Sequence, residues 1–166
     1  MRTFLSILIS TFVFTLSAQN KTWDSVIEGL HNSSTEYLTA FVKKDWDKYM
    51  SYSHPNIIEM AGGKEVLMKV AEETVAMYQS IGFKLESGKV IGDIETVDSS
   101  EGIQAIIPAS LEMSSEGQEN TQSPLKLFAI SSDGGENWIF VDLSRYDPST
   151  ITRFVPEFSE DLKKFW

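Results

Sequence analysis

The stretch that decides the fold reads Leu125-Lys-Leu-Phe-Ala-Ile-Ser-Ser-Asp-Gly-Gly-Glu-Asn-Trp-Ile-Phe-Val-Asp-Leu143. Two apolar runs rich in Phe, Ile, Val and Trp flank its polar centre, residues 131–137. Residues of these types favour a pleated, mostly buried strand. Asp-Gly-Gly supplies the positive backbone angles that a tight turn between antiparallel strands needs. The stretch therefore predicts a hairpin on which the upstream chain packs.

Two further strands are predicted upstream of the hairpin. Residues 103–113 carry apolar side chains at every second position, which indicates a long strand. Pro108 cannot donate a ladder hydrogen bond, so this strand needs an edge or a bulge at that position. Residues 83–94 indicate another long strand, interrupted near Gly88 by a bulge. The polar residues 114–123 predict a flexible loop.

Three helices are predicted ahead of the strands, because apolar residues recur there at three- and four-residue steps. They lie at residues 23–42, 46–53 and 64–80. Thr22 and Asp45 are of the types that cap a helix start, and they precede the first two helices. Pro55 ends the second, since the residue before a proline is pushed out of the helical region. Residues 56–60 read as a short strand.

This order of elements predicts an α+β fold, with three N-terminal helices packed on a curved, mostly antiparallel, cone-like sheet. The chain has 166 residues, 42% of them hydrophobic, which suits one domain with a sizeable core. We expect this single domain to span residues 19–166.

Residues 1–18 have the pattern of a secretory signal peptide. Arg2 supplies a positive start, residues 4–16 are apolar, and Ser17-Ala18-Gln19 offers small residues for cleavage. The apolar run is too short to span a bilayer comfortably, so we expect no membrane-spanning segment after cleavage. The sequence thus predicts export to the periplasm or the extracellular space, by a chain that has no cysteine for disulfides.

The charge and the residue counts disfavour several functions. The net charge of -10 argues against nucleic acid as a partner, because phosphate binding relies on Lys and Arg. Two His residues 23 positions apart, with no Cys, provide no helix-spaced pair of metal ligands. We therefore expect neither a metal site nor a cofactor.

Several motifs resemble a known family. The run Val42-Lys-Lys-Asp-Trp-Asp-Lys-Tyr-Met50, followed by His54-Pro55 and Gly62-Gly63-Lys64-Glu65, resembles the helical half of nuclear transport factor 2-like (cystatin-like α+β cone) domains. The hairpin with Asn137-Trp-Ile-Phe-Val-Asp142 is similar to that family's closing strands. The chain looks most like exported bacterial members.

This resemblance implies a cone with an apolar pocket between the first helix and the sheet. Some members of the family are isomerases, dehydratases or polyketide cyclases, whereas others only bind or assemble. The acid–base residues of the enzymes cannot be carried over residue by residue.

Two residues are candidates for acid–base chemistry. If Trp138 and Phe140 face a pocket, the two-residue period puts Asp142 on the same face, where a carboxylate can act as a base. The alternative is that Asp142 is hydrated at the strand end, or bonded to Arg145 or backbone. His54 is a second candidate base, or it holds a turn before Pro55. Candidate hydroxyl donors are Tyr37, Tyr49, Tyr52 and Tyr78.

Five aromatic residues are candidates to line a ligand cavity, with core packing as the alternative for each. They are Trp46, Tyr49, Tyr78, Trp138 and Phe140.

The sheet has apolar residues on both faces, although helices cover only one. Ile106, Phe128 and Ile130 are out of phase with Ile107, Leu127 and Ala129, so they form an outer apolar face. A second copy would cover this face and give a homodimer. The alternative cover is the C-terminal tail, which contains Phe158, Phe165 and Trp166.

Taken together, these features favour an exported small-ligand-binding or assembly module with a small apolar ligand. The alternative is a cofactor-independent acid–base isomerase or dehydratase that acts on a small apolar substrate in the cone pocket.

Overall fold

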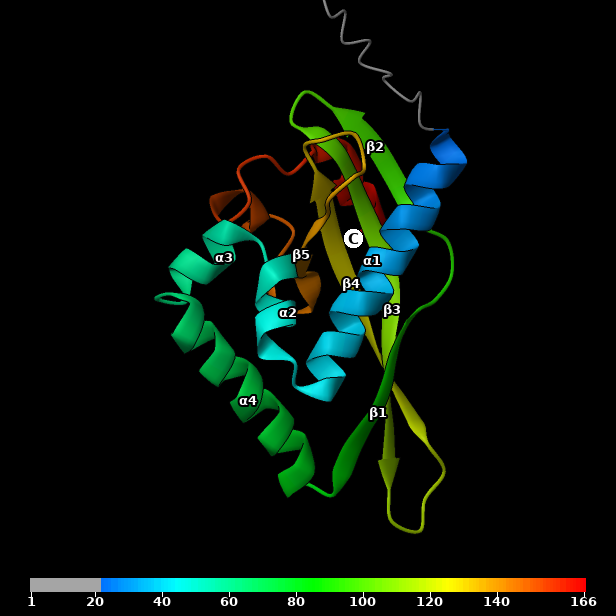
Figure 1. Ribbon diagram of the computed structural model, residues 1–166, viewed down its shortest axis with the longest axis vertical. Helices are drawn as coiled ribbons and strands as arrows, with labels where there is room; N and C mark the ends of the chain where they lie inside the picture. Colours follow the sequence, from blue (N-terminus) through cyan, green and yellow to red (C-terminus); the bar gives the residue numbers. More distant parts are fainter. Residues whose placement is uncertain (1–21) are drawn as a thin grey trace, which may run out of the picture.

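The computed structural model describes residues 22–166, so the expected signal peptide lies outside the described residues. The helices of the described part are α1 (Trp23–Lys43), α2 (Trp46–Tyr52), α3 (Pro55–Met60) and α4 (Lys64–Ser80). The strands are β1 (Phe83–Val90), β2 (Glu95–Ser99), β3 (Gly102–Ser115), β4 (Thr121–Ser131) and β5 (Ile139–Asp142). Three short 3-10 helices follow, η1 (Leu143–Arg145), η2 (Ile151–Arg153) and η3 (Glu160–Phe165) (Figure 1).

The strands form one curled antiparallel sheet, which confirms the predicted α+β fold. Its order is β1-β3-β4-β5, and β2 also pairs with β3, next to the end of β1. The predicted hairpin is present as β4 and β5. In Figure 1, α1 crosses the near face of the sheet and the red C-terminal segment lies behind it.

Pro108 lies where the neighbour of β3 changes from β1 to β2. Val90 pairs with Ala109, and Glu95 pairs with Ile106, so the chain leaves the ladder between these positions. The backbone N–H of Ile91 donates to the Pro108 carbonyl at 2.8 Å. The missing N–H of the proline therefore faces an interruption of the ladder, as the sequence predicts. The expected bulge near Gly88 is a register shift between Leu85 and Ser87.

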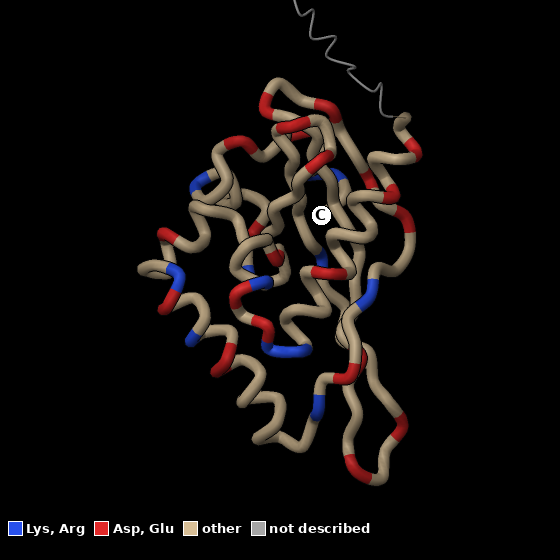
Figure 2. The backbone as a smooth tube through the Cα atoms, in the orientation of Figure 1, with Lys and Arg blue, Asp and Glu red and all other residues tan. Residues whose placement is uncertain are grey.

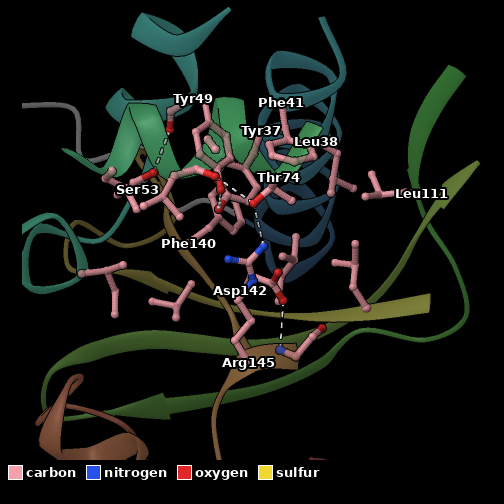
Figure 3. Close-up of a pocket in the computed structure, with 18 of the residues that line it drawn as sticks. Tyr37, Leu38, Phe41, Tyr49, Ser53, Thr74, Leu111, Phe140, Asp142 and Arg145 are labelled. Carbon is pink, nitrogen blue, oxygen red and sulfur yellow. Dashed lines mark hydrogen bonds between the residues drawn. The ribbon is translucent and has the colours of Figure 1, made fainter. Parts of the chain in front are cut away.

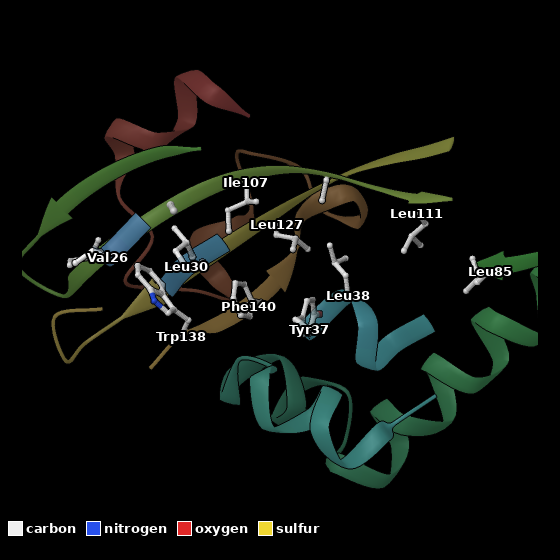
Figure 4. Close-up of a cluster of buried hydrophobic side chains, with 14 of the residues drawn as sticks. Val26, Leu30, Tyr37, Leu38, Leu85, Ile107, Leu111, Leu127, Trp138 and Phe140 are labelled. Carbon is white, nitrogen blue, oxygen red and sulfur yellow. The ribbon is translucent and has the colours of Figure 1, made fainter. Parts of the chain in front are cut away.

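The inner face of the sheet packs on α1 and forms the main core (Figure 4). The predicted cap is present, because the Thr22 side chain accepts from the Ser25 N–H at the start of α1. Lys44 ends the helix in the left-handed region, with φ of 59°. Gly88 lets β1 approach closely, since a Cβ at that position would lie 2.7 Å from the Cβ of Leu38.

Three expectations about local structure are wrong. The strand predicted over residues 83–94 ends at Val90, and a separate strand, β2, follows at Glu95–Ser99. Residues 56–60 belong to helix α3 rather than to a strand. Pro55 suits the first turn of a helix, where its missing N–H leaves no bond unmade, and the His54 side chain accepts from the Asn56 N–H as a cap. Residues 114–123 are not one long loop, because β3 continues to Ser115 and β4 begins at Thr121.

The outer face of the sheet is covered by the C-terminal strap, which we define as residues 146–166. A second buried cluster joins residues of the sheet and of η1 to strap residues: Ile106, Phe128, Ile130, Val141, Leu143, Ile151, Val155, Phe158 and Leu162. Ile106, Phe128 and Ile130 are at most 6% exposed, so they form no open patch for a second copy. The exposed apolar patch on which the predicted homodimer rested is therefore absent from this face. The C-terminal tail, the alternative cover, occupies it instead.

Acidic residues are distributed over helices, strands and loops of the described part of the chain (Figure 2). Within residues 22–166, no helix combines the length and the apolar character needed to cross a membrane.

Candidate functional site

A cavity of about 210 Å³ lies between helices α1 to α4, strands β3 to β5, and η1. Most of its wall is apolar. The apolar lining side chains include Leu38, Phe41, Leu67, Ala71, Leu111, Leu127 and Phe140. Polar side chains also line it, and Figure 3 draws Leu111 towards one end of the cavity, away from Asp142 and Arg145.

Two tyrosines provide a pair of linked hydroxyls in the cavity wall. Tyr37 lies on the inner stripe of α1 and Tyr49 on α2, and their rings stack with centroids 4.7 Å apart. The Tyr37 hydroxyl donates to the Tyr49 hydroxyl at 3.0 Å. Phe140 on β5 also stacks with Tyr37, and the centroids of these two rings are 5.1 Å apart. The hydroxyl pair is thus held between two helices and β5.

Burial raises the pKa of both tyrosines, because the phenolate form is poorly solvated in this wall. The nearby negative charge of Asp142 raises both pKa values further. For Tyr49, the hydrogen bond from Tyr37 opposes this rise. Both hydroxyls consequently stay protonated and act as donors at physiological pH.

The polar end of the cavity contains two side chains of opposite charge. Asp142 precedes η1 and caps it, because its Oδ1 accepts from the Ser144 N–H at 2.9 Å. Arg145 ends η1, and its Nη2 donates to the Thr74 hydroxyl on α4 at 3.2 Å. The cap turns the chain sharply after β5, which brings Arg145 back towards α4 (Figure 3).

Three of the five predicted pocket aromatics line this cavity, namely Tyr49, Tyr78 and Phe140. The other two do not. Trp46 packs edge-on against Phe41 and Tyr49, and Trp138 is buried at the α1 side of the main core.

Of the two acid–base candidates, only Asp142 lines the cavity. His54 is 2% exposed and lies at the start of α3, where its Nδ1 accepts from Asn56 and its Nε2 contacts Glu157 of the strap. Its ring therefore serves the link between α3 and the strap. Tyr52, a candidate donor, instead bonds Glu36 at 2.8 Å.

Sequence reasoning did not place Arg145 or Thr74 in the cavity. Arg145 follows Asp142 by three residues, a spacing that puts two side chains on one side of a tight turn. That signal is weak, because nothing in the sequence says that the turn leads back to α4.

The arrangement suits binding of a molecule with an apolar body and a polar end. Among the described residues, no cluster of three or more His, Asp or Glu side chains could hold a metal ion. No family model, curated protein or solved structure matches this chain.

Proposed function

We propose that this protein is an exported module that binds a small, largely apolar ligand in the cavity between α1, α2, α4 and the sheet. The observation that supports this most is a mostly apolar wall that also carries a group of hydrogen-bonding side chains, which Figure 3 draws close together: Tyr37, Tyr49, Thr74, Asp142 and Arg145. Pockets for drug-sized ligands measure roughly 300–1,000 Å³. A cavity of about 210 Å³ therefore fits a smaller molecule.

Acid–base catalysis is the second candidate, and one observation favours it. Asp142 lines the same cavity as the Tyr37–Tyr49 pair, and its charge acts on both hydroxyls. A carboxylate base opposite protonated hydroxyl donors is an arrangement that moves a proton next to a carbonyl group. The substrate of such an isomerase or dehydratase would occupy the same cavity as the ligand.

The proposal of export rests on residues 1–18, with their positive start, short apolar run and small residues before Gln19. Mass spectrometry of the protein recovered from an exporting host tests it. We expect a mature N-terminus near Ala18, whereas a chain that retains Met1 would contradict export.

Ligand binding is tested by a thermal-shift screen with small aromatic and aliphatic compounds, because a ligand of the folded state raises the melting temperature. The matched control is Ala71→Leu, which fills the cavity from α4. We expect compounds that stabilise the wild type to lose their effect in this variant. Equal stabilisation of both proteins would contradict binding in the cavity.

The same compounds separate binding from catalysis. Turnover of a bound compound that disappears in Asp142→Asn, with the fold intact, would favour the enzyme. Binding without turnover would favour the binding module.

A further inference from the structure

The two charges at the polar end have no ionic partner in the part of the chain that the structure describes. Neither Asp142 nor Arg145 forms an ion pair with any side chain of residues 22–166. One carboxylate oxygen of Asp142 accepts from Ser144, and the other makes no hydrogen bond within those residues. Arg145 makes one hydrogen bond there, to Thr74. Asp142 therefore keeps an oxygen that can accept a hydrogen bond from a ligand, and Arg145 keeps N–H groups that can donate to it.

The Tyr49 hydroxyl is a third group at this end with unused hydrogen-bonding capacity. The Tyr49 hydroxyl accepts from Tyr37, and within residues 22–166 it has no acceptor for its own proton. Tyr49, Asp142, Arg145 and Tyr146 all line the same cavity, and the charges of Asp142 and Arg145 act on the pKa of both tyrosines. Two kinds of donor, a guanidinium and a hydroxyl, thus face the same small volume as one carboxylate.

This balance of charge limits what the polar end can hold. A lone carboxylate on the ligand would be attracted by Arg145 but repelled by Asp142. A lone ammonium would be attracted by Asp142 but repelled by Arg145. A group that offers an acceptor and a donor together can bond to both side chains at this half-open end, where Asp142 is half-buried and Arg145 is exposed.

Resting on the proposed ligand-binding function, we infer that the cavity selects small molecules with an apolar body and a net-neutral head that carries both an acceptor oxygen and an N–H or O–H donor. The acceptor oxygen lies towards Tyr49 and Arg145, the donor lies towards Asp142, and the apolar body extends towards Leu111. A primary amide and the zwitterionic end of an apolar amino acid share this chemistry.

A matched series of phenyl compounds tests the inference by calorimetry on the folded protein. Phenylacetamide and phenylalanine carry both functions, phenylacetate carries only an anion, phenethylamine only a cation, and ethylbenzene no polar head. We expect phenylacetamide, phenylalanine or both to bind at least about tenfold tighter than the two singly charged compounds and ethylbenzene. If phenylacetamide binds more tightly, the cavity prefers an uncharged head; if phenylalanine does, it prefers a zwitterionic one.

Two substitutions then change the preference in opposite directions. Asp142→Asn keeps a cap for η1 and removes the negative charge, so phenylacetate should gain about tenfold in affinity. Arg145→Gln removes the positive charge, so phenethylamine should gain instead. Arg153→Gln, an exposed arginine on η2, is the control and should leave the order unchanged.

The outcomes separate this inference from the function on which it rests. Equal binding of ethylbenzene and the headed compounds would leave a ligand cavity but overturn the selection of the head. Tightest binding of a singly charged compound to the wild type would overturn it too. Binding of none of the five would contradict both proposals.

Discussion

The Nε2 atom of His54 lies 2.5 Å from Oε1 of Glu157, a contact that joins residues 103 positions apart in the sequence. Because Nδ1 accepts from the Asn56 N–H, the neutral ring carries its proton on Nε2 and donates it to Glu157. Gln104, fully buried on β3, donates to the Glu157 carbonyl and accepts from the Ser159 N–H. The strap is thus held to both α3 and the sheet by polar groups as well as by its apolar side chains.

Glu157→Ala should destabilise the fold by about 1–3 kcal/mol, because it leaves the buried Nε2–H of His54 without an acceptor. Glu157→Gln should cost less, since its amide oxygen still accepts from Nε2. Urea unfolding of the three proteins measures the difference. Equal stability of the Ala variant and the wild type would show that the contact contributes nothing.

Phe158 is the strap side chain whose loss should open the outer face. Its ring centroid lies 5.0 Å from that of Phe128, which is 0% exposed. Phe158→Ala should cost about 3–5 kcal/mol and leave a cavity against the sheet. It should also cause self-association that rises with concentration, measured by sedimentation, because an apolar patch becomes accessible.

Trp23→Ala is the control for this change. Trp23 is already 48% exposed, so its substitution should reduce the free energy of unfolding only slightly. A Phe158→Ala protein as stable and as monomeric as the control would contradict the role of the strap as a cover.

The outer face illustrates how far the sequence could predict the fold. Alternation along β3 and β4 is a local property with a period of two, so it correctly predicts that Ile106, Phe128 and Ile130 are buried. It carries no information on which segment covers them. That choice depends on where the strap runs, and hence on distant contacts such as the one between His54 and Glu157.

The cavity has the same division between local and distant information. The two-residue period predicts Phe140 and Asp142 on one face of β5, and both residues line the cavity. Arg145 and Thr74 meet only because η1 folds back on α4, which no local pattern predicts. The error at residues 56–60 has a different cause. A short apolar run suits either a strand or a helix. Here the capping side chain of His54 favours the helix.

Gly102→Ala should be severely destabilising. Gly102 is the first residue of β3 and has a φ of 122°, and a Cβ there would overlap with the carbonyl oxygen of Ser131 on β4. Gly92→Ala is the matched control, because Gly92 also has a positive φ, 70°, but a Cβ added to it would point into open space. We expect a cost of about 1 kcal/mol for the control and at least about 3 kcal/mol for Gly102→Ala. Equal losses in urea unfolding would mean that the contact with β4 is not limiting.

The β4–β5 loop depends on Asp133. Its Oδ1 accepts from the Ser131 hydroxyl and from the N–H groups of Glu136 and Asn137, and its Oδ2 accepts from the Asn137 side chain. Partial burial disfavours the ionised carboxylate, but these hydrogen bonds outweigh that effect and lower its pKa from 3.8 to about 2.

A lowered pKa in the folded state means that the ionised Asp133 stabilises the fold above the unfolded value of 3.8, and that this stabilisation is lost as the pH falls towards 2. Because Asp133 is exposed, solvent screening reduces the effect to about 1 kcal/mol. The free energy of unfolding of Asp133→Asn should therefore lie below that of the wild type by this amount at pH 6, and the two should converge near pH 2. Glu116→Gln, which removes an exposed acid from the β3–β4 turn, controls for net charge and should follow the wild type. If Asp133→Asn differed from the wild type by the same amount at pH 2 and at pH 6, the stabilisation would not come from ionisation of this carboxylate.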